Sequence, residues 1–396
     1  MSTRSFEKGV PQAAGRALTP PFTPEHEELR ASLRRFVETE LYPHADAWEE
    51  ARWFPDTLFP RLGELGFLGL KYPLRYGGQG GDYLHDAVLA EEFARCGSAG
   101  VAAGLGAHIT IATPPVWKFG TEDQKQRYLV PSIAGTKIAA LGITEPDAGT
   151  DVAGLRTKAT KVDGGWTISG SKTYITNGVR ADYVVMAVKT TPEGGHGGIS
   201  FFLVDTDQPG YSTSKLEKLG WHASDTGLIA LDAVFVPEQN LLGELHGGFK
   251  LIMANFQWER LSMALGAVSG ADFVVEQTLR YAAERVAFGK PIGQFQVIRH
   301  KFAEMATQIE AGRQLTYHAL RLFMGGHDAI QEVTMAKLAT QRMAFEVADT
   351  CLQIHGGAGY MVEYGIERAA RDARLGPIGG GTDEIMREIL GRTMGL

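Results

Sequence analysis

Residues 141–152 read LGITEPDAGTDV, and residues 170–178 read GSKTYITNG. Each stretch joins an apolar, β-branched run to a turn of glycine, proline or asparagine that carries hydroxyl side chains. Such runs favour strands, and such turn residues end them. Hydroxyls and backbone N–H groups on paired turns can bind the edge of a flat heteroaromatic ligand and its diphosphate without adding charge. The pair therefore predicts a small β domain that carries a cofactor.

The sequence around this pair is that of an antiparallel β domain, a barrel or sandwich, over residues 137–246. The segment VDGGW at 162–166 is typical of a hairpin. The apolar runs that indicate strands cover residues 183–188, 199–204, 227–231 and 233–236.

Helical periodicity fills the chain on both sides of this domain. In the N-terminal helical domain, residues 23–136, Thr23-Pro24 predicts a helix start and TEDQ at 121–124 predicts a capping box. The C-terminal domain, residues 247–396, is expected to be a four-helix bundle, so the fold class is α+β. The longer helical patterns cover residues 57–70, 84–96, 98–117, 248–285, 294–324, 329–354, 363–373 and 382–394.

Composition excludes several classes of protein. The 396 residues have a net charge of −7, which does not favour binding to nucleic acid or to an anionic membrane. No apolar run is long enough to span a membrane. Two cysteines, Cys96 and Cys351, cannot form a disulfide framework and fit a reducing compartment. Residues 1–22 lack the apolar segment of a secretory signal, so they are expected to be a flexible tail of a cytoplasmic protein. No metal-ligand spacing such as H-E-x-x-H occurs, and no metal site is predicted.

The two opening stretches resemble the flavin-binding segments of the acyl-CoA dehydrogenase family, whose patterns read roughly T-E-P-x-A-G-S-D and Y/W-I-T-N-G. The resemblance covers nearly the whole chain and implies FAD as the cofactor. It places Thr144 at the flavin ring near N1, and Thr176 near N5 with Tyr174 packed beside the ring. Thr150 stands where the family usually has serine and is expected to serve the diphosphate or the CoA arm. The first stretch also contributes the cofactor contacts Leu141 and Ile143.

Three later segments continue the resemblance. RVAFG at 285–289 is similar to the family motif that reaches the FAD of a neighbouring subunit, with Arg285 on the diphosphate and Phe288 on the adenine. The resemblance adds further FAD contacts at Gln296, at Gln353 and Gly357 in QIHGG, and at Thr382 and Glu384 in TDE. Contacts to a neighbour's FAD imply a homo-oligomer, and a homotetramer built as a dimer of dimers is expected.

The reaction of this family is α,β-dehydrogenation of an acyl-CoA thioester, as in fatty acid β-oxidation. It needs a carboxylate that removes an α-proton, a flavin that takes the β-hydride, and hydrogen bonds that hold the thioester oxygen. Many members carry the carboxylate in the pattern I/Y-E-G-T just before the last helix. Here the matching stretch, residues 377–382, reads PIGGGT, so Gly380 stands where that glutamate would be.

Long-chain and isovaleryl members instead place the base on the first C-terminal helix, in the pattern E-R-L, and residues 257–261 here read QWERL. On a helix, Glu259 shares a face with Ile252, Phe256 and Met263, and a carboxylate on so apolar a face is either paired or functional. Glu259 is therefore the predicted base. Glycine at 380 leaves space for its carboxylate, and burial should raise its pKa.

The resemblance also implies residues that bind the acyl-CoA substrate. It places Arg260 near the CoA moiety and Gln257 in the lining of the substrate region. The backbone N–H of Gly380, together with a flavin ribityl hydroxyl, is expected to hold the thioester oxygen, with Gly381 beside it. Room for a long or branched acyl chain is suggested by the small residues Gly100, Ala102, Ala103, Gly104 and Gly106.

Three functions remain open at this point. The first is a dehydrogenase that passes electrons to an electron-transferring flavoprotein, and the length of 396 residues favours it. The second is an acyl-CoA oxidase with the same site and O₂ as the acceptor. The third is a non-catalytic protein that binds FAD and acyl-CoA, which the missing glutamate at 380 would explain.

Overall fold

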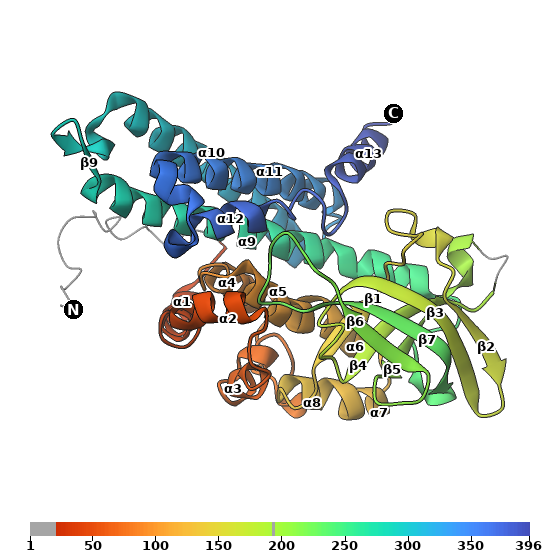
Figure 1. Ribbon diagram of the computed structural model, residues 1–396. Helices are drawn as coiled ribbons and strands as arrows, with labels where there is room; N and C mark the ends of the chain where they lie inside the picture. The colour runs from red at the N-terminus through yellow and green to blue at the C-terminus, as the bar shows by residue number, and fades with distance from the viewer. Residues whose placement is uncertain (1–20, 192–194) are drawn as a thin grey trace.

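Helix α9 (Gly248–Glu284) runs through the molecule and touches all of its parts (Figure 1). In the computed structural model, which describes residues 21–191 and 195–396, the helix packs against the sheet, against N-terminal helices, and against two long C-terminal helices. The architecture is helical, then β, then helical, as the sequence predicts. Most of the expected N-terminal tail, residues 1–20, lies outside the described residues.

The N-terminal domain consists of short helices, some of which begin at the predicted caps. Helix α1 begins at Pro24 directly after Thr23, and α7 begins with a reciprocal cap in which Gln124 N donates to Thr121 Oγ1 at 3.2 Å. The single helix predicted over 57–70 is interrupted, because Gly66 takes a left-handed backbone at φ +77°. The helices are α1 (Pro24–Phe36), α2 (Ala45–Ala51), α3 (Leu58–Glu64), α4 (Tyr83–Phe93), α5 (Ala99–Gly106), α6 (Thr113–Phe119), α7 (Glu122–Gln124) and α8 (Val130–Ile133).

The middle domain is one eight-stranded sheet in the order β6-β7-β3-β2-β4-β5-β8, with β1 beside β4. Neighbouring strands are antiparallel except that β1 runs parallel to β4 and β2 meets β4 at one parallel pair, so the predicted antiparallel domain is mixed here. The runs at 227–231 and 233–236 form one strand rather than two. The strands are β1 (Ala139–Gly142), β2 (Lys158–Val162), β3 (Gly165–Thr176), β4 (Tyr183–Lys189), β5 (Ile199–Asp205), β6 (Tyr211–Lys215), β7 (Thr226–Pro237) and β8 (Leu241–Leu242).

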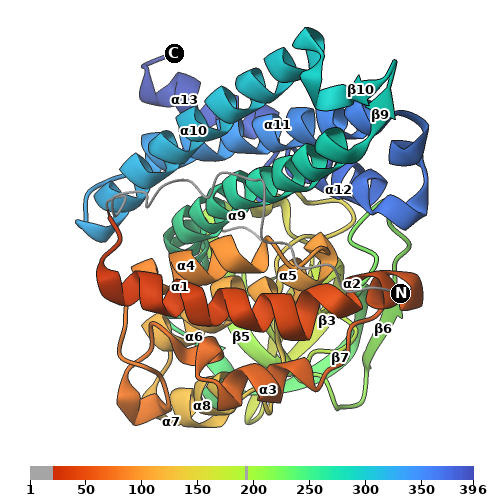
Figure 2. The same cartoon turned by 90° about the vertical axis from the view of Figure 1, so that its left-hand side faces the viewer.

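The C-terminal domain packs α9, α10 (Gln296–Met324) and α11 (Ile330–His355) along one another, with the shorter α12 (Ile366–Ala373) and α13 (Asp383–Thr393) against them. A small hairpin of β9 (Val286–Ala287) and β10 (Lys290–Pro291) joins α9 to α10. Figures 1 and 2 both place this hairpin at the opposite end of the domain from α13.

Both cysteines are buried free thiols, and burial raises the pKa of Cys96 and of Cys351 to about 11. Within the described ranges, no helix combines the length and the apolar composition that a membrane crossing requires.

One buried cation ties the middle domain to the N-terminal domain. The guanidinium of Arg180 donates to Asp225 Oδ1 at 2.7 Å and to Asp56 Oδ1 at 2.8 Å. It also lies over the rings of Trp53 and Phe54. The side chains of Arg180 and Asp225 have no exposed surface, so removing either would leave the other charge buried and less compensated.

Asp225→Asn is therefore expected to lower the free energy of unfolding by about 3 kcal/mol. The matched control is Glu238→Gln, because Glu238 pairs with Lys161 at the surface of the same domain. An exposed pair of that kind contributes at most about 1 kcal/mol. Urea denaturation followed by circular dichroism measures both variants, and equal losses would contradict the role given to Arg180.

Candidate active site

Glu259 projects from α9 toward the turn that precedes α13. The residue is half-buried, and its Oε2 atom is shielded from solvent with no hydrogen-bond partner among the described residues. Burial raises the pKa of Glu259 to about 7, although the positive charges of Arg260 and Lys337 act in the opposite direction. A carboxylate that is near half ionisation at neutral pH and has a free oxygen is suited to accept a proton.

Three consecutive glycines, residues 379–381, form the part of the turn nearest this carboxylate. A Cβ on Gly380 would stand only 2.5 Å from Met263 Sδ, so glycine makes room for Met263. The same Cβ would be in ordinary van der Waals contact with Glu259 Oε1, at 3.9 Å, which places the turn beside the carboxylate. Gly380 and Gly381 have φ of +63° and +101°, a region that favours glycine. Their N–H groups make no hydrogen bond with any described residue, which leaves two donors open beside the carboxylate.

The two predicted flavin segments lie side by side and are joined by a buried ion pair. Lys172 Nζ donates to Glu145 Oε1 at 2.7 Å and to the carbonyl of Ile143 at 3.0 Å. Thr173 N donates to the carbonyl of Thr144 at 2.9 Å. The pair thus fixes the backbone on both sides of Thr144, whose side chain remains half-buried.

An irregularity in β3 directs the second segment outward. The pairing of β3 with β7 shifts between Lys172 and Ile175, and Tyr174 takes a positive φ of 60°. Bulges of this kind redirect side chains. Tyr174 is consequently 71% exposed between two buried neighbours, and Thr176 is half-buried.

Packing joins these segments to the helix that carries Glu259. Ile143 belongs to the same hydrophobic cluster as Leu251, Ile252 and Phe256 of α9. On the other side, Asn177 Nδ2 donates to the carbonyl of Gly104 in α5 at 2.8 Å. The sheet, α5 and α9 therefore meet beside the two predicted flavin segments.

A second group of predicted cofactor residues lies at the far end of α9. Arg285 and Gln296 are exposed at the two ends of the β9–β10 connection, and Phe288 at its tip is 97% exposed with a positive φ. Gln353 and Gly357 are also exposed, at the end of α11. Arg285 follows Glu259 by 26 residues, which is about 39 Å along a helix. Within one chain, these residues and Glu259 cannot contact the same flavin ring.

The remaining predicted residues lie on α9, around the start of α13, and on or after β1. Gln257 and Arg260 are half-buried on α9, and Thr382 caps α13 by accepting a hydrogen bond from Ile385 N at 3.4 Å. Glu384 is exposed on that helix, and Thr150 is exposed beyond β1. Leu141 is half-buried at the end of β1.

The three parts of the chain match the three domains of one enzyme family. Residues 23–136 match the N-terminal domain of acyl-CoA dehydrogenases, residues 140–234 the middle domain, and residues 246–395 the C-terminal domain. The chain belongs to the acyl-CoA dehydrogenase family. It is thus a member of a family of oxidoreductases that act on acyl-CoA.

Similar proteins support this family over almost the full length. The chain is 40% identical to a probable acyl-CoA dehydrogenase of Bacillus subtilis (strain 168), covering 94% of this chain and 98% of the relative. It is 38% identical to the mitochondrial long-chain specific acyl-CoA dehydrogenase of Sus scrofa, covering 94% and 86% of the two chains. The crystal structure of acyl-CoA dehydrogenase from Geobacillus kaustophilus superposes with a TM-score of 0.92 at 40% identity, covering 95% of this chain and all of that one.

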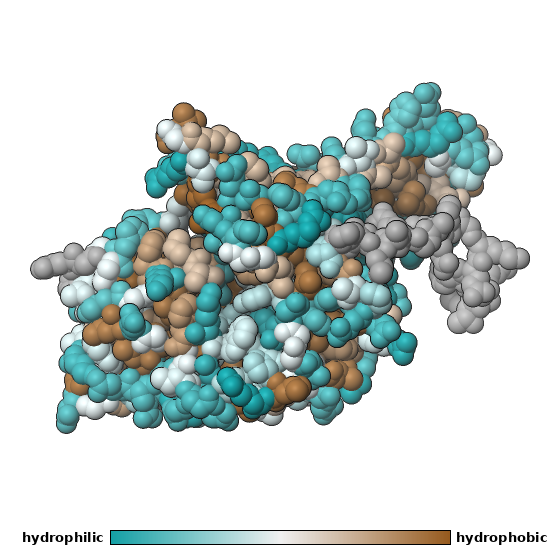
Figure 3. Space-filling view, turned by 180° about the vertical axis from the view of Figure 1, so that it is seen from behind, coloured by the Kyte–Doolittle hydropathy of each residue, from teal (hydrophilic) through white to brown (hydrophobic). Residues whose placement is uncertain are grey.

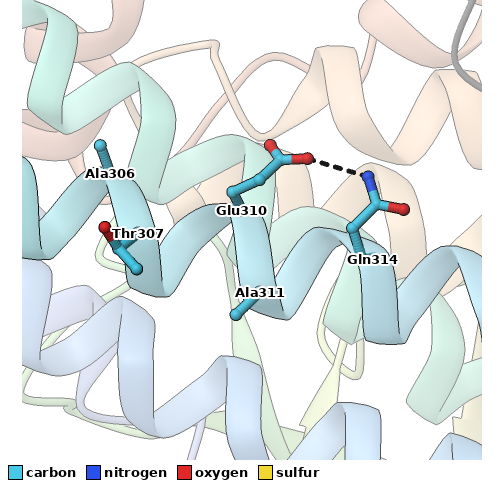
Figure 4. A pocket seen from close by; sticks show the side chains of 5 residues that line it. All are labelled: Ala306, Thr307, Glu310, Ala311 and Gln314. Atoms are coloured by element: carbon cyan, nitrogen blue, oxygen red, sulfur yellow. Dashed lines mark hydrogen bonds between the residues drawn. The ribbon is translucent and has the colours of Figure 1, made fainter.

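Two other features of this chain do not belong to the site. A hollow of about 460 Å³ on the outer face of α10 is lined by Ala306, Thr307, Glu310, Ala311 and Gln314 (Figure 4). None of the predicted site residues lines it. Among the described residues, His26, Asp82 and His85 also have potential metal-ligand atoms within 4.8 Å of one another. Both histidines already cap the starts of α1 and α4, where the positive helix ends disfavour a cation.

The small residues of α5 serve different purposes. A Cβ on Gly104 would stand 2.5 Å from the ring of Phe54, and one on Gly100 would stand 3.0 Å from Glu49 Oε1, so both glycines allow close packing. A Cβ on Gly106 would meet nothing within 4 Å. Only the last of these three therefore has the open space expected beside an acyl chain.

The sequence reading missed the polar residues that support the site. Lys172, Lys337 and Asn177 are completely buried and hold backbone carbonyls of the site segments or of their neighbours. A signal was present for two of them, because each lysine lies within an apolar pattern, Lys172 in a strand and Lys337 in a helix. Their partners are distant in sequence, so the pattern alone could not name them.

The raised pKa of Glu259 makes stability depend on pH. Its pKa is about 7 in the folded chain against an ordinary value of 4.5, so the folded state binds more protons between these values and loses stability as the pH rises through them. Glu259→Gln removes the buried charge. The variant is expected to have a higher Tm than the wild type at pH 8 and nearly the same Tm at pH 5. Thermal unfolding followed by circular dichroism at both pH values tests this, and a difference independent of pH would contradict it.

Proposed function

We propose that this chain catalyses FAD-dependent α,β-dehydrogenation of an acyl-CoA thioester to the trans-2-enoyl-CoA, with electrons passed to an electron-transferring flavoprotein. The observation that supports it most is the free, shielded Oε2 of Glu259 beside a turn that has glycine at 380. A glutamate at 380 would require Met263 to move and would be strained by the positive φ at this position, which supports a base that comes from α9.

Three groups of this chain act on the substrate. The carboxylate of Glu259 removes the α-proton, and its pKa of about 7 makes it a stronger base than an exposed glutamate. The open N–H of Gly380 holds the thioester oxygen as negative charge develops there. Gln257 and Arg260 are three residues apart on α9 and so share one face of it, and we assign this face to the CoA arm. Because Glu259 and the turn are held by different helices, the two act on neighbouring substrate atoms at once.

The residues present fit FAD at both of its ends. The hydroxyls of Thr144 and Thr176 and the exposed ring of Tyr174 suit the flavin, which supplies the hydride acceptor when bound. The exposed guanidinium of Arg285 and ring of Phe288 suit a diphosphate and an adenine. Since α9 separates these ends, we assign the second group to the FAD of a neighbouring copy in a homotetramer. Figure 3 shows hydrophobic side chains reaching the surface along the C-terminal helices, which such an assembly would cover.

Removing the base tests the reaction. Glu259→Gln is expected to slow the bleaching of flavin absorbance by acyl-CoA by about 10³-fold, the usual contribution of a general base, while the FAD content stays at the wild-type level. Glu284→Gln, at the exposed end of the same helix, is the matched control and should keep the wild-type rate. The assay uses a panel of acyl-CoAs of increasing length and branching, and the acyl-CoA that bleaches the wild-type flavin fastest is used to compare the variants. Unchanged bleaching in Glu259→Gln would falsify the proposed base.

Removing the distant cation tests the shared cofactor. Arg285→Ala is expected to raise the Kd for FAD by about 10-fold or more, because a charge-assisted contact to the diphosphate is lost. Arg280→Ala changes an exposed arginine in the last turns of α9 and should leave the Kd unchanged. Titration of the apoprotein with FAD measures the Kd, and size-exclusion chromatography shows whether the oligomer persists. A wild-type Kd in the Arg285→Ala oligomer would rule out this contact.

A further inference from the structure

Two cations hold the glycine turn that faces Glu259. Arg260 Nε donates to the carbonyl of Gly380 at 3.2 Å, and Lys337 Nζ donates to the carbonyl of Gly381 at 2.6 Å. The two cations come from different helices, α9 and α11. Lys337 has no exposed surface, which is unusual for a lysine.

The turn depends on these contacts for its orientation. It has two consecutive residues with positive φ, and glycine backbones without side chains are conformationally free. The N–H groups of Gly380 and Gly381 bind no described residue, so they do not anchor the turn. The Gly380 N–H belongs to the peptide between Gly379 and Gly380, and the peptides on both sides of it are held. Gly379 N donates to the carbonyl of Leu375 at 2.9 Å, and the carbonyl of Gly380 accepts from Arg260. Holding these two neighbours restricts the direction of the Gly380 N–H.

The same cations face the carboxylate of Glu259. Burial disfavours the ionised form of Glu259, whereas Arg260 and Lys337 favour it. Lys337 is in turn faced by the acidic groups of α13, Asp383 and Glu384, and Asp383 also pairs with Arg342 of α11. Burial lowers the pKa of Lys337 to about 8, so its ammonium remains mostly charged at neutral pH.

We propose that Lys337 is a positioning residue of the active site, which fixes the Gly380–Gly381 turn through the Gly381 carbonyl and keeps Glu259 ionised through its charge. The proposal rests on the proposed function, in which Glu259 is the base and the Gly380 N–H holds the thioester oxygen. It differs from a purely structural role for a buried lysine, because a structural role would not change the titration of Glu259.

Two substitutions separate the contact from the charge. Lys337→Gln removes the charge and keeps a donor for the carbonyl, whereas Lys337→Met removes both. In each variant, the acid limb of the kcat/KM pH profile is expected to move up by about half to one pH unit, the effect of one partly screened charge. Lys337→Met is also expected to lower kcat further than Lys337→Gln does. Thr340→Val, a buried shape-preserving change on the next turn of α11, is the control and should keep the wild-type profile.

A second measurement needs no bound cofactor and no turnover. In the apoprotein at pH 7.5, Glu259→Gln should raise Tm more in the Lys337→Gln background than in the wild-type background, because the uncompensated carboxylate is then more costly to bury. Equal Tm gains in the two backgrounds, or an acid limb that does not move in folded Lys337 variants, would overturn the proposal. If no acyl-CoA bleaches the flavin absorbance of the wild-type protein, the proposed function is wrong. The comparison of Tm values among the apoprotein variants still decides whether Lys337 controls the titration of Glu259.

Discussion

Taking the carboxylate of Glu259 out of water is the constraint on which the site depends. Burying an ionised carboxylate is costly, and a close ion pair would make the ionised form too stable to accept a proton. The surroundings of Glu259 lie between these two cases, an isolated buried carboxylate and a carboxylate in a close ion pair. Two cations stand close enough to act on the charge of Glu259, but both donate their hydrogen bonds to the carbonyls of a neighbouring turn. The Oε2 atom is left shielded and free.

Rigid supports from all three domains hold the groups around this carboxylate. The ion pair of Lys172 and Glu145 joins the two turns that the sheet presents, and Asn177 joins the second of them to α5. The hydrophobic cluster that includes Ile143 continues onto α9. Each reactive group therefore stands on an element that is packed on several sides, as a site with precise geometry requires.

Local patterns in the sequence predicted much of this arrangement. The paired turns, the family motifs and the replacement of a glutamate at 380 by Glu259 can each be recognised from a few neighbouring residues. The family assignment built on them is confirmed. The parallel pairing of β1 with β4 and the carbonyls held by Lys172 and Lys337 were not predicted. These features join residues far apart in the chain, and periodicity carries no information about such partners. The roles of the individual site residues remain predictions.

The length of α9 has a consequence for how the protein would behave in solution. The groups suited to the flavin and those suited to the adenine lie toward opposite ends of this helix. Phe288, just beyond its C-terminal end, is almost completely exposed to solvent. In the proposed homotetramer, each cofactor is completed by a second chain. Dilution below the dissociation constant of the subunits would then release FAD along with the partner, so that FAD binding and subunit association become one coupled equilibrium.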